Sequence, residues 1–223
     1  MERHFLIALV FILNGCQTQK IDESTPLEVK TNFSLEVAIP KKPPKNIWEH
    51  IIVNSDNKDE ILLDKKTSYF LNSHLRNKKE LNDYLNKSYY FIYYVTQELE
   101  AANLPVELAL IPFIESNYDP FSISPSGAVG LWQFMPKTGR LYNLEKSWWN
   151  EDRHDPFRST HAAIGYFKYL FERFDNDIYL ALAAYNAGPT YLERQINKNL
   201  RKGLGTDFWS LDLNQQVTNY IPK

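Results

Sequence analysis

The sequence is poor in the residues that hold metals and form disulfides. It contains one cysteine, Cys16, in 223 residues, so no disulfide can form within the chain. It has no CxxC pair, no HExxH motif and no glycine-rich phosphate or dinucleotide loop. A calcium-loop pattern starts at Asp175, but Leu180 stands where that loop needs glycine. The sequence therefore indicates none of the common zinc, calcium or nucleotide sites, and we expect no metal and no cofactor.

Neither sign of charge dominates the chain. Its 25 Lys and Arg residues oppose 27 Asp and Glu residues, which leaves a net charge of −2. Nucleic-acid-binding domains need a basic face, so nucleic acid is not an expected partner. Apolar residues make up 43% of the chain, as in ordinary globular proteins. Aromatic residues reach 14%, which fits either a well-filled core or a groove in which rings pack on sugar faces.

The N-terminus lacks a hydrophobic run long enough to span a membrane. Its apolar stretch from Phe5 to Leu13 has nine residues, whereas a spanning helix needs about 20. Such a stretch is typical of an export signal. The segment Leu13-Asn14-Gly15-Cys16 resembles the lipobox of bacterial lipoproteins, which implies cleavage before Cys16 and lipidation of that residue. Gln17 is typical of outer-membrane sorting in that class. The alternative is an incidental or buried cysteine behind an ordinary signal.

Composition and periodicity divide the chain into four segments. They are a signal peptide (1–15), the lipidated cysteine with a polar, flexible tether (16–46), a helical N-terminal extension (47–86) and a main helical domain (87–223). Trp48, Ile51 and Ile52 recur at helical spacing in the extension. Alternating apolar residues near 33–39 allow a short strand within the tether.

Helical patterns dominate the main domain. Residues 106–116 are apolar nearly all round, which predicts a buried helix that Pro112 should kink. No run alternates convincingly as a strand, so the predicted fold class is mainly α. The expected helices are 87–102, 106–116, one capped by Ser159 or Thr160 that reaches Phe174, and Ile178 to Ala187, capped by Asp177 and ended by Gly188-Pro189.

Glu115 is the most informative carboxylate in the sequence. It lies at the end of the apolar segment 106–116, just before the chain breaks toward Pro120. Burial disfavours the charged form of a carboxyl and raises its pKa, which is what a general acid needs near neutral pH. The alternative is a glutamate that caps or pairs locally at a helix end. Asp119, the nearest other carboxylate, precedes a proline and is interpreted as a turn residue.

Four short motifs follow one another along the chain. They are Glu115-Ser116-Asn117-Tyr118-Asp119-Pro120, Ser126-Gly127-Ala128-Val129-Gly130-Leu131-Trp132-Gln133-Phe134-Met135-Pro136, Ala184-Tyr185-Asn186-Ala187-Gly188 and Asn219-Tyr220-Ile221-Pro222. The ordered set resembles the soluble-lytic-transglycosylase (SLT) domain, closest to its membrane-bound murein transglycosylase D type. The resemblance covers roughly residues 46–223. It implies a mainly α, lysozyme-like fold, as in goose-type lysozyme, with the SLT catalytic domain at 87–223.

The family's domain normally continues past the last motif, and this type often carries LysM repeats beyond it. A fragment or a C-terminally shortened variant is therefore expected.

The same resemblance implies a reaction on the glycan strands of peptidoglycan. Glu115 would be the only catalytic carboxylate. It would protonate the oxygen between N-acetylmuramic acid (MurNAc) and N-acetylglucosamine (GlcNAc), then take the proton of the C6 hydroxyl as a 1,6-anhydro ring closes without water. A hydrolytic muramidase on the same fold and a non-catalytic peptidoglycan-binding lipoprotein are the alternatives. The expected location is the bacterial cell envelope, anchored by lipid in the inner leaflet of the outer membrane and facing the periplasm.

The resemblance also implies a set of substrate-binding residues, namely Ser116, Gln133, Tyr185, Asn186 and Tyr220. Ser116 is expected to orient Glu115, Tyr220 to bond its carboxyl, and Gln133 to hold an acetamido group through its amide. Tyr185 and Asn186 end a buried helix, where polar tips need partners. Each of the five has a structural alternative: a hydroxyl bonded to the backbone, a satisfied core amide, a packing aromatic or a purely structural network.

Two other groups of residues remain to be interpreted. Trp132 and the pair Trp148-Trp149 fit a groove or the core equally well. The polar segment from Asp152 to Asp155 is expected to be a solvated loop.

Overall fold

The computed structural model of the protein describes residues 46–55 and 65–222. The predicted signal peptide, the lipidation site Cys16 and the strand near 33–39 lie outside these residues. The described residues belong to one compact unit that spans Pro40 to Lys223. Every helix among them is too short or too polar to serve as a membrane span. The boundary expected between residues 86 and 87 falls within a helix and stays a prediction.

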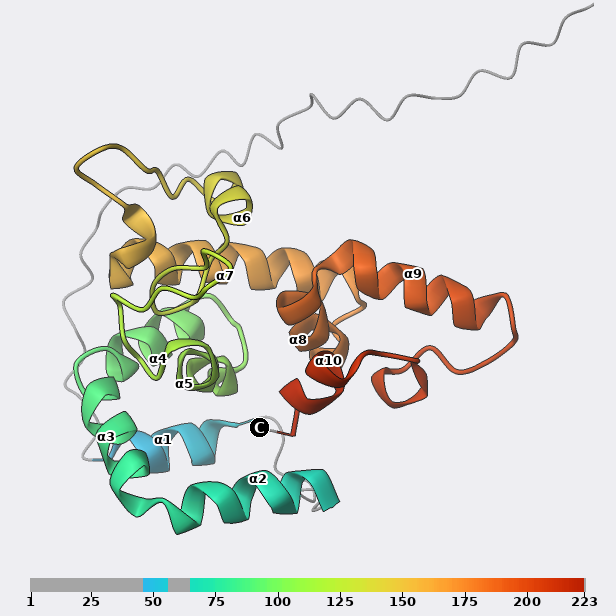
Figure 1. The fold of residues 1–223 in the computed structure, drawn as a ribbon, viewed down its shortest axis with the longest axis horizontal. Coiled ribbons are helices and arrows are strands. Elements are labelled where there is room, and N and C mark those ends of the chain that lie inside the picture. The colour runs from blue at the N-terminus through green and yellow to red at the C-terminus, as the bar shows by residue number, and fades with distance from the viewer. Residues whose placement is uncertain (1–45, 56–64, 223) are drawn as a thin grey trace, which may run out of the picture. The chain divides into compact units, whose positions relative to one another are not determined.

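Helices make up the regular structure of the described chain (Figure 1). The α-helices are α1 (Ile47–Asn54), α2 (Lys65–Arg76), α3 (Lys78–Ser88), α4 (Ile92–Ala101), α5 (Ile111–Ser116), α6 (Pro136–Leu141), α7 (Pro156–Arg173), α8 (Ile178–Ala187), α9 (Pro189–Leu200) and α10 (Gln215–Tyr220). The 3-10 helices are η1 (Val106–Leu110), η2 (Asp152–His154) and η3 (Phe208–Ser210). In the same residues, β-structure is limited to isolated bridges. The predicted mainly α fold class is thereby confirmed for this part of the chain.

Helices α7 and α8 lie at the centre of the packing. α7 contacts α4, α8 and η2, while α8 contacts α9, α10 and η3 (Figure 1). The α8 residues Ala181, Ala183 and Ala184 have no exposed surface. Alanine favours the helix, and its small side chain lets neighbouring elements pack closely against α8. The packing of α10 on α8 ties the C-terminal helix to the core.

The apolar segment 106–116 does not form one helix. It forms η1 and then α5, so the expected single helix kinked at Pro112 is wrong. Pro112 lies in the first turn of α5, where its missing N–H costs no helical hydrogen bond. Asn117 and Tyr118, which follow α5, both have left-handed backbone angles, with φ of 53° and 58°. These unfavourable angles turn the chain sharply just after Glu115, which lies in the last turn of α5.

The starts of α7 and α8 show which capping signals are decisive. The carboxylate of Asp155 caps α7 by accepting two main-chain N–H groups at 2.8 and 3.0 Å. Ser159 and Thr160, the expected caps, lie inside the helix and bond back to main-chain carbonyls, so that prediction is wrong. Pro156 explains the difference, because proline is favoured at the first helical position and aspartate just before it. α8 begins after Asp177, as expected.

Two other helix boundaries differ from those expected. The predicted helix 87–102 is shortened to α4, because α3 extends to Ser88 and a turn separates the two. Gly188 ends α8 as expected, but Pro189 also opens a new helix, α9, that the sequence analysis missed. A proline is both a stop for one helix and a favourable start for the next.

A buried arginine holds the loop after α5. Asp152 and Arg153 are only 3% and 4% exposed, so the expected solvated loop is wrong. The Arg153 guanidinium donates to both carboxylate oxygens of Glu151, at 2.7 and 2.9 Å. It also donates to the carbonyls of Gly127 and Phe134, at 3.0 and 2.8 Å. The hydrogen bond from Arg153 holds the pKa of Glu151 below its usual value. Because a buried charge must be paired and hydrogen-bonded, Arg153 fixes the path of this loop.

Gly130 allows the main chain of Arg153 to approach the loop. Gly130 has φ +84°, and a Cβ there would lie 1.8 Å from the Arg153 carbonyl oxygen. We predict that Gly130→Ala lowers the free energy of unfolding by about 2–5 kcal/mol, through unfavourable φ and overpacking. Gly127→Ala is the matched control, because Gly127 has φ +87° but no atom within 4 Å of the added Cβ. It should cost only about 1–2 kcal/mol. Urea unfolding measures the free energy of unfolding of both variants. Equal losses of stability would contradict the role given to the Arg153 contact.

Candidate active site

The carboxyl of Glu115 accepts a hydrogen bond from the C-terminal helix. Tyr220, the last residue of α10, donates its hydroxyl to Glu115 Oε1 at 2.6 Å across 105 positions of the sequence. Tyr220 is 6% exposed. Burial, followed by the charge of Glu115, raises the pKa of Tyr220 well above its usual value. The phenol therefore stays protonated and remains a donor to this carboxyl near neutral pH.

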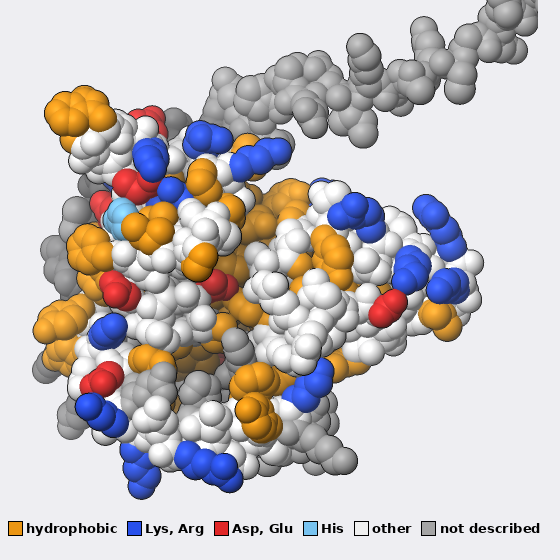
Figure 2. Space-filling view, in the orientation of Figure 1, with side chains coloured by type: hydrophobic (Ala, Val, Ile, Leu, Met, Phe, Trp, Pro, Cys, Tyr) orange, Lys and Arg blue, Asp and Glu red, His pale blue; other side chains and the backbone are white. Residues whose placement is uncertain are grey.

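A second tyrosine lies within electrostatic reach of Glu115. Tyr185, on α8, donates its hydroxyl to the carbonyl of Trp132 at 2.7 Å, and its ring stacks on Phe167 with centroids 4.7 Å apart. Burial raises the pKa of Tyr185 well above its usual value, and the charge of Glu115 adds to the shift. The structure thus brings together residues of α5, α8 and α10. Figure 2 shows the surface hollowed between the part over α5 and the part over α8 and α10.

Ser116 attaches α5 to the neighbouring loop. Its hydroxyl donates to the carbonyl of Leu131 at 2.8 Å and to that of Pro112 at 3.1 Å. The residue is 7% exposed. This arrangement matches the alternative of a hydroxyl bonded to the backbone at a helix end, because its hydrogen is directed at main-chain carbonyls. Ser116 therefore fixes the position of α5, on which Glu115 lies.

Gln133 is held so that one end of its amide is available. Its backbone is left-handed, with φ of 49°. The side-chain Nε2 donates to the carbonyls of Gly130 at 2.8 Å and Ser122 at 3.2 Å. Among the described residues, none donates to Oε1. The amide nitrogen is thus occupied by the protein, and the amide oxygen can accept a hydrogen bond from a ligand N–H.

Asn186 carries an unsatisfied polar atom. It follows Tyr185 on α8, and its Oδ1 is buried without a hydrogen-bond partner in the described part of the chain. Leaving such an acceptor unsatisfied costs about 1–3 kcal/mol, and it is unusual enough in folded proteins to need an explanation. Because the Oδ1 is buried, a substrate could reach it and remove that cost only after neighbouring side chains move aside.

The remaining predicted residues separate into core, turn and surface. Trp132 has no exposed surface, and its indole N–H bonds to a threonine of α7 at 3.0 Å, so it belongs to the core. Trp148 and Trp149 are 88% and 71% exposed. The Asp119 carboxylate accepts the N–H of Phe121 at 2.9 Å, which confirms the interpretation of Asp119 as a turn residue.

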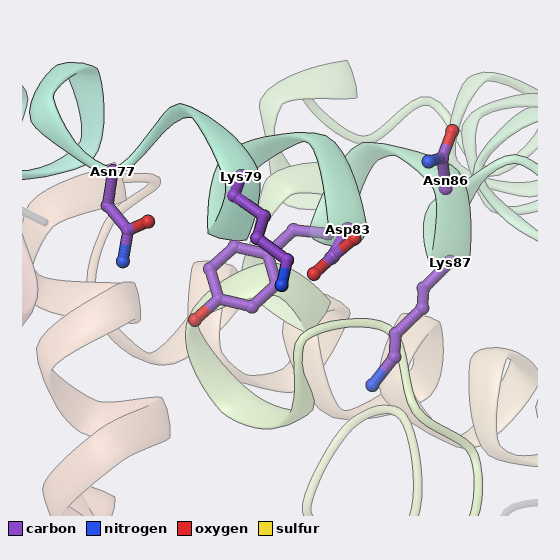
Figure 3. Close-up of a pocket in the computed structure, with 6 residues that line it drawn as sticks. Asn77, Lys79, Asp83, Asn86 and Lys87 are labelled. Atoms are coloured by element: carbon purple, nitrogen blue, oxygen red, sulfur yellow. The ribbon is translucent and has the colours of Figure 1, made fainter.

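Two open pockets lie away from these residues. One, of about 560 Å³, is lined by α3 and the residue before it, through Asn77, Lys79, Asp83, Tyr84, Asn86 and Lys87. Figure 3 shows Lys79 and Asp83 pointing from α3 into the same space. The other, of about 270 Å³, lies around Arg173 and Glu193. Neither is lined by a predicted site residue. In the described ranges, no group of three or more His, Cys, Asp or Glu could hold a metal ion.

Comparison with known proteins gives consistent matches. Residues 93–205 match the family model described as "Transglycosylase SLT domain". Membrane-bound lytic murein transglycosylase D of Escherichia coli (strain K12) is 39% identical over 150 residues, which cover 67% of this chain and 33% of that protein. Membrane-bound lytic murein transglycosylase F of Alcanivorax borkumensis is 34% identical over 116 residues, 49% of this chain and 23% of that protein.

Among solved structures, the 70 kDa soluble lytic transglycosylase of Escherichia coli has a TM-score of 0.40 and 26% identity. That likeness covers 48% of this chain and 18% of the other. The chain spans about a third of the length of its Escherichia coli D-type relative.

We predict that the phenols of Tyr185 and Tyr220 ionise only as the protein unfolds in alkali. Their pKa values are raised in the folded state above the unfolded value of about 10. Their contribution to stability is thus complete below about pH 10 and is lost as the pH rises further. In an alkaline titration followed by tyrosinate absorbance, Tyr220→Phe should reduce only the phase that accompanies unfolding. A reduction of the earlier, reversible phase would contradict the buried, protonated state of Tyr220.

Proposed function

The chain belongs to the transglycosylase SLT domain family, and we propose that it is a peptidoglycan lytic transglycosylase. It would cleave the β-1,4 bond between MurNAc and GlcNAc without water and leave 1,6-anhydroMurNAc ends. The observation that carries this proposal is the Glu115 carboxyl, held by the buried phenol of Tyr220 at 2.6 Å. The proposed catalytic domain comprises residues 87–223, with residues 47–86 as its N-terminal extension.

Glu115 acts twice in the proposed reaction. As an acid, it donates its proton to the glycosidic oxygen, and the bond to the muramic C1 breaks as GlcNAc leaves. The acetamido oxygen of MurNAc closes on C1 and takes up the positive charge. As a base, Glu115 then removes the proton of the C6 hydroxyl, whose oxygen displaces the acetamido oxygen at C1. The proton that Glu115 lost is returned, and no water is consumed. Substrate-assisted routes of this kind need one carboxylate rather than two.

The tyrosines suit a carboxyl that must both lose and regain a proton. A neutral donor at Glu115 Oε1 fixes the orientation of the carboxyl without adding a charge that would hold it permanently ionised. Because their pKa values are raised, neither Tyr185 nor Tyr220 competes as a proton donor near neutral pH. The Tyr220 phenol therefore positions the acid, the Tyr185 hydroxyl stays bonded to the Trp132 carbonyl, and Glu115 alone transfers protons.

Two amide oxygens are suited to hold the substrate. The Gln133 Oε1 and the Asn186 Oδ1 accept no hydrogen bond from the described protein. The acetamido groups of MurNAc and GlcNAc each carry one N–H donor. An acceptor on the acetamido N–H of MurNAc would turn its oxygen toward C1, as the second half of the reaction requires. We assign Gln133 to substrate on this ground, and Asn186 would join it once the side chains over its buried Oδ1 move aside. Ser116 acts through the placement of α5.

The proposed location follows from the relatives and from the N-terminal motif. Two of the proteins that this chain resembles are named membrane-bound. We propose attachment to the cell envelope through lipid on Cys16, in the inner leaflet of the outer membrane. The tether to residue 46 would let the domain reach the peptidoglycan strands, since 30 flexible residues span roughly 30 Å on average.

Replacing Glu115 tests the proposed reaction. Glu115→Gln keeps the shape of the side chain but cannot transfer a proton. Since general acid–base catalysis contributes about 10²–10⁴-fold, release of anhydromuropeptides from purified peptidoglycan should fall at least that far. Asp119→Asn is the matched control, because an asparagine oxygen can still accept the Phe121 N–H. It should release products at close to the wild-type rate.

The outcomes of this comparison are distinct. Circular dichroism melts of all three proteins show whether each is folded. Near-equal release by a folded Glu115→Gln variant would place the acid elsewhere. Release of reducing ends in place of anhydro ends would indicate a muramidase, and no release by any of the proteins would indicate a glycan-binding lipoprotein.

The anchor is tested at Cys16. Cys16→Ser removes the thiol that would carry the lipid, so the exported protein should move from the membrane fraction to the soluble fraction after a high-salt wash. The salt wash screens ionic contacts with lipid headgroups that would obscure the result. Fractionation and immunoblotting measure the distribution. A Cys16→Ser protein that stays wholly in the washed membranes would contradict the lipobox interpretation.

A further inference from the structure

Two adjacent indoles project from the loop between α6 and η2. Trp148 and Trp149 are 88% and 71% exposed, and their rings meet edge to face at 4.5 Å and 89°. Figure 2 shows hydrophobic side chains at the outer end of this loop. Tryptophan is large and largely apolar, so on average it is highly buried in proteins. Two neighbouring exposed indoles therefore need an explanation outside the folding of this domain.

The loop holds the indoles outward by a structured turn. The Ser147 N–H donates to the Asn150 carbonyl at 2.7 Å, and the Asn150 N–H donates to the Ser147 hydroxyl at 3.1 Å. The Asn150 side-chain amide donates to buried Asp152 at 2.6 Å. A β-bridge between Lys146 and Glu151 closes the base of the turn. The exposure of the two indoles is thus a property of an ordered, hydrogen-bonded turn.

Exposed basic and apolar side chains lie on α6 and in the loop that carries the indoles. Lys137, Arg140 and Lys146 are exposed on α6 and the following loop. Leu141, at the end of α6, is 67% exposed. Figure 2 shows Lys and Arg side chains gathered over α6.

The acidic groups nearby are mostly paired. Arg153 engages both oxygens of Glu151, Lys146 lies 3.3 Å from the same carboxylate, and Arg158 donates to Asp152 at 3.0 Å. Glu145 is the further acidic residue of this loop, and it is exposed. With Lys146 paired to Glu151, the exposed charges left on α6 and this loop are Lys137 and Arg140 against Glu145.

We propose that Trp148, Trp149 and Leu141, with Lys137, Arg140 and Lys146, form a docking surface for an anionic phospholipid bilayer. Indoles favour the boundary between headgroups and acyl chains, where the ring is buried and its N–H stays hydrated. Lys and Arg close to an anionic surface each strengthen binding by about fivefold.

A sugar chain is the less suitable occupant of this surface. The two rings stand nearly perpendicular at the end of a projecting loop and offer no shared flat platform. Leu141 has no ring on which a sugar could stack. Lys137 and Arg140 match phosphate headgroups by charge, and Lys146 is shared with Glu151. The shape and the charge of this surface therefore both favour the bilayer.

Contact of this loop with the bilayer would act together with the proposed lipid anchor. The lipobox implies an anchor with several acyl chains, which holds a protein on a membrane without a second contact. The Trp148–Trp149 loop would instead set the orientation of the domain on the bilayer. This role does not depend on the reaction proposed for Glu115.

Vesicle binding tests the docking surface in the full chain carrying Cys16→Ser, so that no lipid anchor contributes. Co-sedimentation would use vesicles of phosphatidylglycerol with phosphatidylcholine, and of phosphatidylcholine alone. Quenching of indole fluorescence by brominated acyl chains reports how deeply the indoles enter the bilayer. Trp148→Ala/Trp149→Ala should weaken binding to the anionic vesicles at least tenfold and remove most of the quenching. Lys137→Gln/Arg140→Gln/Lys146→Gln should weaken binding to the anionic vesicles alone.

Trp209→Ala is the matched control, because Trp209 is 55% exposed but lies in η3, outside the proposed surface. It should bind vesicles as the parent protein does. Urea unfolding of each variant checks its stability. Unchanged vesicle binding and quenching in the double tryptophan variant would overturn the proposal. So would a loss of binding to insoluble peptidoglycan with vesicle binding intact, which would make the loop a glycan contact.

Discussion

The hydrogen bond from the Tyr220 hydroxyl to the Glu115 carboxyl is the contact on which the proposed site depends. It joins the last turn of α5 to the end of α10, so the site exists only when both parts of the domain have folded. The donor is buried and cannot ionise near neutral pH, because its pKa is raised. A carboxyl held by a neutral donor keeps its orientation while its own proton comes and goes. A single residue that serves first as acid and then as base needs this property.

Left-handed backbone angles and an unsatisfied polar atom occur at residues of the proposed site and beside Glu115. Asn117, Tyr118 and Gln133 have left-handed backbone angles, and the Oδ1 of Asn186 is buried without a partner in the described chain. Such features cost about 1–3 kcal/mol each and persist only where the surrounding structure enforces them. At Gln133 the enforcement comes from Arg153, whose hydrogen bonds to the Gly127 and Phe134 carbonyls hold the loop that carries Gln133. The backbone of Gln133 therefore depends on a contact from another part of the chain.

Features set by local pattern were predictable from the sequence, and those set by distant contacts were not. The helix at 178–187 with its Asp177 cap, the turn at Asp119 and the mainly α class follow from short-range signals. The burial of Arg153 depends on the carbonyls of Gly127 and Phe134, which no local pattern places beside it. The α7 cap was missed for a local reason, because the Asp-Pro pair at its start is a stronger signal than the serine and threonine that follow.

The central claim is that Glu115 alone carries out a glycan cleavage that consumes no water. The most direct test is digestion of purified peptidoglycan by the wild-type protein in water enriched in the heavy oxygen isotope, followed by mass spectrometry of the products. The account predicts anhydroMurNAc ends that contain no heavy oxygen. Reducing ends that contain one heavy oxygen for each bond cleaved would contradict it, because water would then be the nucleophile.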